Sequence, residues 1–144
     1  MPKIIALCAV VLLLAGCSQK PALEDLADGK CTSSVVDVVN IHISGQIDAL
    51  AKKDWELAHS FASENFQANV SVAEFTIIIG AQYAMLIENK GYEFNECTVT
   101  GNTIKQDVNV LSGEQEFSLT YTITVNDSAL GIESAVVGEI SSQI

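Results

Sequence analysis

The chain has 144 residues, of which 49% are hydrophobic, and it carries a formal net charge of −11 with no arginine. This length suits one domain of ordinary size, and the apolar content excludes a wholly disordered chain. The excess of acidic residues repels phosphate backbones, so we expect no nucleic-acid partner.

The first sixteen residues have the composition of a secretory signal. The positively charged start Met1-Pro2-Lys3 precedes the uncharged run Ile4–Ala15, and small residues then lead into Cys17. As a helix, this run spans only about 18 Å, which is too short for a hydrocarbon core of about 30 Å. A charged start, an apolar middle and a small-residue end are typical of a signal peptide. We therefore predict that residues 1–16 are removed before Cys17.

The end of this segment, Leu14-Ala15-Gly16-Cys17, resembles the lipobox of bacterial lipoproteins. The resemblance implies a diacylglyceryl thioether on Cys17 and acylation (for example by palmitate) of the new amino terminus, which would hold the protein on a membrane. Ser18 follows the cysteine in place of an aspartate, which favours the periplasmic side of the outer membrane over the inner membrane. The alternative is an ordinary signal peptide with a coincidental cysteine. Residues 17–32 are then expected to form the lipidated end and a polar tether.

Two cysteines, Cys31 and Cys97, remain after the one expected to carry lipid. In an oxidising periplasm a leftover pair favours a disulfide, although two separately buried thiols are the alternative. The chain has no Cys-x-x-Cys pair, and its two histidines are scattered. We therefore expect no metal site and no cofactor.

Two helices are predicted in the first half of the remaining chain. Apolar residues recur at three- and four-residue spacing from Ser33 or Ser34 to Lys52, which predicts a long amphipathic helix. Asp54 can cap a second, short helix. That helix is expected to end at residues 63–65, and residues 66–69 are expected to form a connector.

A capping box starts the third predicted helix. Ser71 and Glu74 have the spacing in which each side chain bonds the other residue's backbone N–H, so the helix should begin at Val72. Its apolar positions continue to Leu86, and the helix is expected to end before Gly91.

From residue 92 onward the apolar period changes from helical spacing to alternation. Residues 117–125 alternate apolar and polar side chains, which predicts a half-buried strand. Short turns separate it from its neighbours, which favours an antiparallel meander. Four strands are expected, at 92–99, 104–111, 117–125 and 131–140. Three helices followed by four strands predict an α+β fold in which the helices pack on one face of a curved antiparallel four-stranded sheet.

Three short runs carry a family resemblance: Gln46–Leu50, Asp54-Trp55 and Ala58–Ser63. Together they resemble an uncharacterised family of secreted bacterial proteins, domain of unknown function 4864, although Glu64-Asn65 stands where a proline often follows. That family is similar to the nuclear transport factor 2-like superfamily, a helix-lined cone closed by a bent sheet. The resemblance covers about residues 35–140 and implies one cone-like α+β domain over 33–144. It assigns no reaction, because the superfamily hosts isomerases, dehydratases and binding modules.

A cone of this type would enclose a pocket, for which we name seven lining residues. They are Trp55, Phe75, Tyr83, Leu86, Tyr92, Phe94 and Tyr121. The alternative is that these side chains simply fill the core. His42 and His59 are the obvious acid–base candidates, but both are better explained as solvated or edge histidines, so no catalytic residue is assigned.

These observations favour a non-enzymatic, membrane-anchored lipoprotein domain that binds a protein partner or a small apolar ligand. One alternative is a small isomerase, dehydratase or hydrolase that uses a buried acid or histidine. Another is a structural component of the cell envelope, for instance a homodimer formed through the sheet. The interior distinguishes the three: a polar dyad favours an enzyme, an apolar cavity favours a ligand-binding protein, and a filled core favours a surface-acting module.

Overall fold

One antiparallel sheet forms the framework of this computed structural model, which describes residues 22–138. Its strands are neighbours in chain order, from β1 to β5. They are β1 (Gly29–Lys30), β2 (Asn89–Thr100), β3 (Thr103–Ser112), β4 (Gln115–Asn126) and β5 (Ala129–Val137). The helices are α1 (Ser33–Ala51), α2 (Trp55–Ser60), α3 (Glu64–Asn69), α4 (Val72–Gln82) and α5 (Ala84–Ile87). The α+β class and the antiparallel meander predicted from the sequence are both confirmed.

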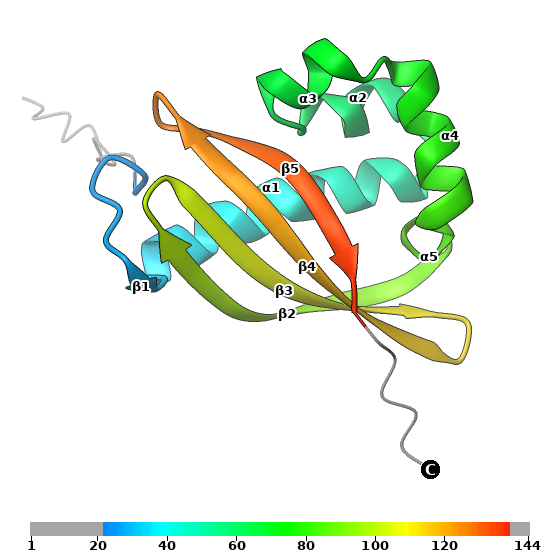
Figure 1. The fold of residues 1–144 in the computed structure, drawn as a ribbon. Coiled ribbons are helices and arrows are strands. Elements are labelled where there is room, and N and C mark those ends of the chain that lie inside the picture. Colours follow the sequence, from blue (N-terminus) through cyan, green and yellow to red (C-terminus); the bar gives the residue numbers. More distant parts are fainter. Residues whose placement is uncertain (1–21, 139–144) are drawn as a thin grey trace, which may run out of the picture.

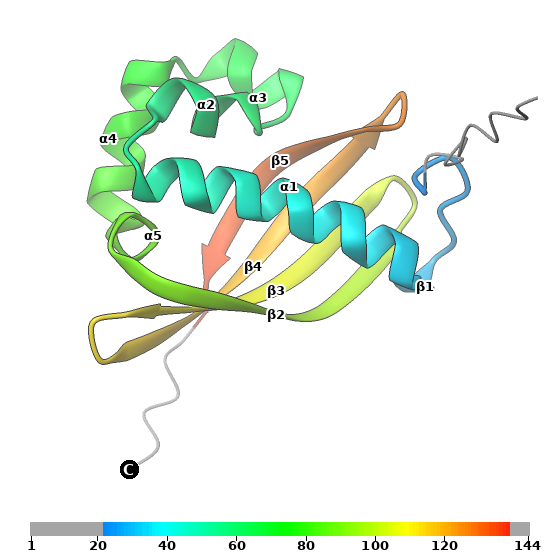
Figure 2. The ribbon, with the colours of Figure 1, turned by 180° about the vertical axis from the view of Figure 1, so that it is seen from behind.

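The helices pack on one face of the sheet. The strands bend around α1, which crosses the concave face, while α2, α3 and α4 gather on the β5 side (Figures 1 and 2). Alternation along the strands points apolar side chains toward α1: Val108 and Leu119, for example, are fully buried. The opposite face is mostly polar, and there Thr120 donates a hydrogen bond to Asp107 Oδ1 at 2.7 Å. No helix of the described residues covers that face.

The long helix α1 supplies the other half of the core. Its buried apolar side chains share one stripe: Val35, Val39, Ile43, Ile47 and Leu50. Thr32 caps the helix, because its side chain accepts a hydrogen bond from the Val35 N–H, so the cap lies one or two residues before the serines expected in that role.

The described residues contain two more helices than the sequence predicts. The expected connector at 66–69 belongs to α3, which Ser63 caps by accepting the Phe66 N–H at 3.0 Å. The expected third helix is divided in two, because Tyr83 leaves the helical conformation with φ −129° and ψ 31°. The chain then re-forms one turn as α5 before β2 begins at Asn89, three residues earlier than expected.

Residues 22–32 differ from the expected polar tether. Leu23 and Leu26 pack against the core, and β1 pairs with β2 as a fifth strand. Cys31 and Cys97 form a disulfide with a Cα–Cα distance of 5.4 Å, which confirms the predicted bond. Residues 1–21, with the expected signal segment and Cys17, lie outside the described residues.

The capping box at the start of α4 is confirmed in both directions. The Ser71 hydroxyl accepts the Glu74 N–H at 3.2 Å, and the Glu74 carboxylate accepts the Ser71 N–H at 2.9 Å. We expect Ser71→Ala to lower the free energy of unfolding by about 1 kcal/mol in urea denaturation. Ser33→Ala is the control, because that serine is not a cap, and it should change stability by much less. Equal effects of the two changes would contradict this assignment.

Candidate functional site

A mostly apolar cavity of about 150 Å³ lies between the helices and the β5 side of the sheet. It is bounded by α1, the α2–α3 connection, α3, α4, α5 and the inner faces of β4 and β5. The residues that line it are Gln46, Ala62, Phe66, Phe75, Ile78, Ile79, Tyr83, Leu86, Tyr121, Ile132, Glu133, Ser134 and Ala135. No lysine lines it, so its lining offers no cation to an anionic ligand.

The connection between α2 and α3 joins the helices to the sheet beside this cavity. Ala62 and Ile132 form an isolated parallel bridge. The Ile132 N–H donates to the Phe61 carbonyl, and the Ser63 N–H donates to the Ile132 carbonyl, both at 3.0 Å. The backbones approach so closely that a Cβ at Gly131 would lie 2.5 Å from the Ser63 Cα. Glycine at 131 therefore permits the contact that holds the helices over the cavity.

Three polar side chains of α1, α4–α5 and β4 reach the lining. The Gln46 side-chain amide donates to the Ala58 carbonyl at 3.2 Å, and the Tyr83 hydroxyl donates to the Ala135 carbonyl. The hydroxyl of Tyr121, in contrast, is buried and has no hydrogen-bond partner among the described residues. Burial raises the pKa of Tyr121 far above its ordinary value, so the phenol stays neutral.

The structure brings four of the seven expected pocket residues together at this cavity. Phe75, Tyr83, Leu86 and Tyr121 line it. The other three, Trp55, Tyr92 and Phe94, do not belong to its lining. Tyr92 and Phe94 lie on β2, away from β5, where their rings meet edge to face and the Tyr92 hydroxyl donates to Asp48 Oδ1 at 2.8 Å.

Several lining residues are not among the seven, for three different reasons. Ile78 and Ile79 belong to the helical period that runs through Phe75 to Leu86, so the sequence predicts that they face inward, although they are not among the seven residues named for the pocket. Phe66 is expected in a connector, which has no periodicity from which the direction of its side chain could be predicted. The stretch 132–135 lies on β5, where a register shift disturbs the alternation opposite Thr122 and Ile123.

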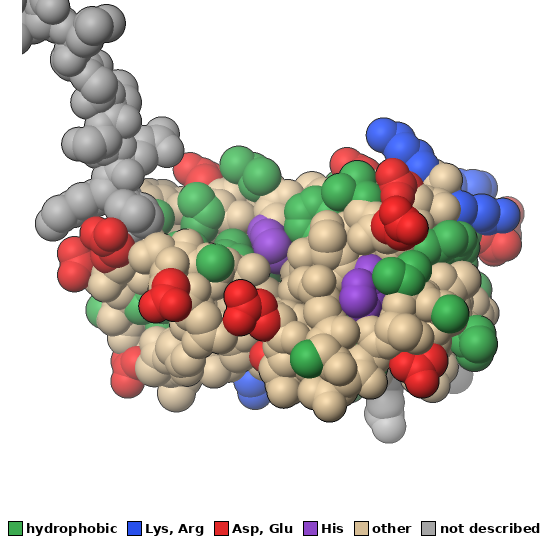
Figure 3. Space-filling view, turned by 90° about the horizontal axis from the view of Figure 1, so that it is seen from above, with side chains coloured by type: hydrophobic (Ala, Val, Ile, Leu, Met, Phe, Trp, Pro, Cys, Tyr) green, Lys and Arg blue, Asp and Glu red, His purple; other side chains and the backbone are tan. Residues whose placement is uncertain are grey.

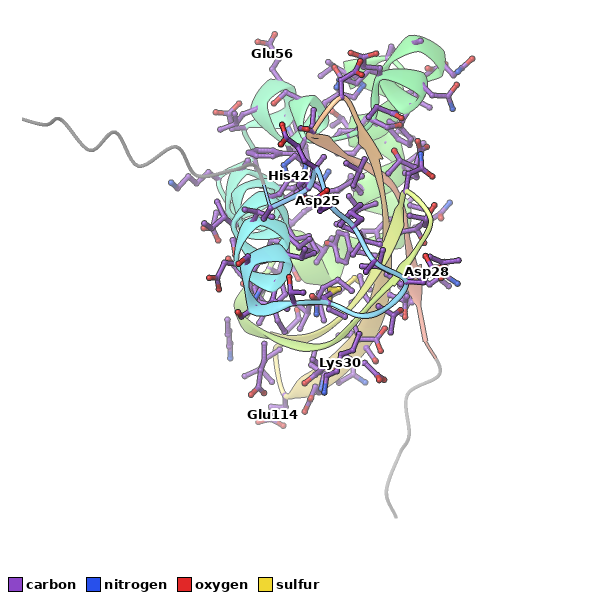
Figure 4. The ribbon with its side chains drawn as sticks, turned by 90° about the vertical axis from the view of Figure 1, so that its left-hand side faces the viewer. Asp25, Asp28, Lys30, His42, Glu56 and Glu114 are labelled. Atoms are coloured by element: carbon purple, nitrogen blue, oxygen red, sulfur yellow. A yellow bond between two sulfur atoms is a disulfide. The ribbon has the colours of Figure 1, made fainter. Side chains whose placement is uncertain are left out.

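Both histidines bond backbone carbonyls. The His42 ring bonds the Phe61 carbonyl at 2.8 Å and meets the Phe61 ring edge to face, in the space between α1 and α2 (Figure 4). The His59 ring bonds the Val70 carbonyl at 2.6 Å and so ties α2 to the start of α4. Seen from above, both imidazoles are visible on a face that also carries acidic side chains (Figure 3), but His59 is only 8% exposed, so it is a buried histidine and not the solvated or edge residue expected. Neither histidine lines the cavity.

The environment of His42 predicts a pH effect on stability. Desolvation by burial lowers its pKa, and the hydrogen bond to the Phe61 carbonyl opposes this only in part. A histidine with a lowered pKa in the folded state resists protonation, so the folded state loses stability as the pH falls below about 6.5. We expect the free energy of unfolding to fall less between pH 7.5 and 5.5 in His42→Gln than in the unmodified protein. Identical pH profiles in urea denaturation would contradict this.

The described residues hold no group of three or more histidine, cysteine or acidic side chains placed to bind a metal ion. Within 22–138, no helix combines the length and the apolar character needed to cross a membrane. The acid at the cavity, Glu133, turns its carboxylate to the Thr124 hydroxyl at 3.1 Å. The site is therefore a mostly apolar space, beside which the Tyr121 side chain is fully buried.

Together these features define a small α+β domain whose concave sheet and helices border a mostly apolar, partly open cavity. Residues 34–140 match the family described as Domain of unknown function (DUF4864), and the chain belongs to that family. Neither a curated protein nor a solved structure matches the chain.

Proposed function

We propose that this protein is a bacterial lipoprotein, held by acyl chains on Cys17 at the periplasmic side of the outer membrane, whose domain binds a small apolar ligand. Residues 1–16 serve as its signal peptide. The domain is a member of the nuclear transport factor 2-like superfamily, a proposal supported by the helix-lined concave sheet. Binding of the ligand, not catalysis, is the activity of this domain.

The apolar cavity carries this proposal. An engineered cavity of about 150 Å³, lined by similar side chains in another protein, binds benzene or xenon. The cavity here has a similar volume, although it is partly open to solvent, and it is lined largely by Phe, Ile, Leu and Ala side chains. Cores are otherwise packed with few voids larger than a water molecule, so an apolar space of this size suits a ligand. It suits one of about six non-hydrogen atoms, well below drug size.

The two alternatives have less support. An enzyme of this type would need an acid or a histidine at the cavity. Both histidines instead bond backbone carbonyls, and the Glu133 carboxylate turns to Thr124. A role confined to the surface does not account for the apolar cavity, whereas ligand binding does.

The ligand-binding proposal can be tested by thermal unfolding. A ligand that binds only the folded state raises the unfolding temperature, so benzene should stabilise the protein increasingly, with the logarithm of its concentration once that exceeds the dissociation constant. Ala135→Leu places a larger side chain in the lining and should abolish the shift. Ala129→Leu, an exposed change at the other end of β5, is the matched control and should keep it. An equal shift in all three proteins, or none in the unmodified one, would refute the proposal.

The anchoring proposal is tested separately. We expect the unmodified protein to fractionate with membranes and to partition into detergent, and Cys17→Ser to give an unprocessed or soluble product. Cys8→Ser, within the same apolar run, is the control and should leave partitioning unchanged. Normal membrane retention of Cys17→Ser would contradict lipidation at this residue.

A further inference from the structure

The cavity opens to solvent between the helices and the edge strand β5, and we call this opening its mouth. The exposed and half-buried lining residues mark it, because the rest of the lining is buried. They are Phe66, Ile78 and Tyr83 on the helical side, and Glu133, Ser134 and Ala135 on β5. A ligand that reaches the apolar interior from solvent therefore passes between these two sets of side chains.

Two connections of different kinds cross from the helices to β5 at the mouth. At Ile132 the connection is made by backbone, through the hydrogen bonds to Phe61 and Ser63 at 3.0 Å. At Ala135 it is made by a side chain, because the Tyr83 hydroxyl donates to the Ala135 carbonyl. Three residues of a strand span about 10 Å, so these connections bound a short opening. The first cannot open without moving the chain, whereas the second opens by rotation of one side chain.

The neighbours of Tyr83 hold both helices in place around it. Ile79, about one turn earlier on α4, and Leu86, on α5, are both buried in the core. Tyr83 itself lies at the break between the two helices and is only half-buried. Water can therefore replace the hydroxyl at the Ala135 carbonyl, which makes the net contribution of this hydrogen bond small. The ring can leave the mouth while α4 and α5 stay where they are.

Resting on the ligand-binding function proposed above, we infer that Tyr83 is the gate of the cavity. While its hydroxyl bonds the Ala135 carbonyl, the ring narrows the mouth, and a small apolar molecule enters or leaves when this bond breaks and the ring rotates outward. The same bond forms over the empty and over the occupied cavity. Tyr83 therefore sets the rates of binding and release, and the buried lining sets the affinity.

An extended peptide does not suit this mouth. A peptide that adds a strand to a sheet edge needs a row of free backbone groups along that edge. Here the N–H and carbonyl of Ile132 already bond the α2–α3 connection, and the Ala135 carbonyl bonds Tyr83. The gate thus admits a small molecule in preference to a peptide.

The rates of benzene binding and release test this inference. They are measured by chemical-exchange NMR on the unmodified protein, on Tyr83→Phe and on Tyr92→Phe. The Tyr92 hydroxyl bonds Asp48 Oδ1 and the residue lies outside the lining, so Tyr92→Phe is the matched control. We expect both rates to rise about fivefold in Tyr83→Phe, because the ring keeps its shape and loses its hydrogen bond. The dissociation constant should stay within twofold, and Tyr92→Phe should leave all three quantities unchanged.

A residue that merely contacts the ligand would change the dissociation constant and the release rate, whereas a gate changes both rates together. If benzene binds the unmodified protein and Tyr83→Phe leaves the association rate unchanged, or loses affinity, the gate is refuted while the ligand-binding function stands. An equal rise of the rates in Tyr92→Phe would also refute it. If benzene does not bind the unmodified protein, the ligand-binding function itself fails.

Discussion

Replacing both cysteines of the disulfide, in Cys31→Ser/Cys97→Ser, should lower the free energy of unfolding by about 4 kcal/mol. The two residues are 66 positions apart, so the bond removes a large part of the conformational freedom of the unfolded chain. Small domains are typically stable by about 5–15 kcal/mol, so this loss would remove a large part of the total stability. It is the largest loss that we expect.

Urea denaturation of the oxidised protein and the double variant measures this effect. The unmodified protein, unfolded in the presence of a reductant, is the control and should match the double variant. Local backbone pairing does not replace the disulfide: the Cys31 N–H donates to the Cys97 carbonyl at 3.0 Å, but a single hydrogen bond contributes only about 1 kcal/mol. A loss below about 1 kcal/mol would show that the bond does not constrain the unfolded chain.

The second large effect is expected for Gly131→Ala, with a loss of about 2–3 kcal/mol in the free energy of unfolding. The new Cβ would lie 2.5 Å from the Ser63 Cα, which is backbone and cannot rotate away. The α2–α3 connection must then move off β5, which weakens the bridge between Ala62 and Ile132 beside the cavity. We therefore expect the variant to lose benzene binding as well as stability.

Gly80→Ala is the matched control for this prediction. A Cβ at Gly80 has nothing within 4 Å, and the residue is exposed within α4. Alanine is the better helix former, so this change should raise stability by about 0.5–1 kcal/mol. If Gly131→Ala were as harmless as Gly80→Ala, the close contact between β5 and residue 63 would be absent in solution.

The long elements could be predicted because their periodicity extends over many residues. The stripe of α1 repeats through five buried positions, and the alternation of β4 continues without interruption from Phe117 to Val125. The capping box also identified the start of α4 correctly, because two side chains and their spacing specify it. Such local signals do not depend on knowing the tertiary structure.

The short elements could not be predicted in this way. The six residues of α3 are too few to show a helical period, and the sequence predicts the end of one helix at Ser63, whereas this residue caps the next helix. The break at Tyr83 has no glycine or proline at the break itself, and Gly80, three residues earlier, lies within α4. It follows from packing, since the Tyr83 hydroxyl bonds the Ala135 carbonyl, 52 residues away. The pairing of β1 with β2 depends equally on partners that are distant in the sequence.

The cavity could be predicted only in part, for a related reason. Alternation and helical period say which side chains face inward, and Phe75 and Tyr121 were identified on that basis. They do not say at which end of the sheet a space remains. The answer depends on the strand order, which places β2 far from β5, and on the α2–α3 connection that meets β5 at Ile132.

Mapping benzene binding by methyl NMR is the most direct test of the central claim that this domain holds an apolar ligand in its cavity. In a sample with labelled Ile and Leu methyl groups, a benzene titration should shift the signals of Ile79, Leu86 and Ile132, which line the cavity. The signals of Ile41 and Leu57, which are exposed and lie outside the lining, should not move. Saturable shifts confined to the first set are the predicted result. Shifts confined to the exposed set, or no saturable shift at all, would contradict the account.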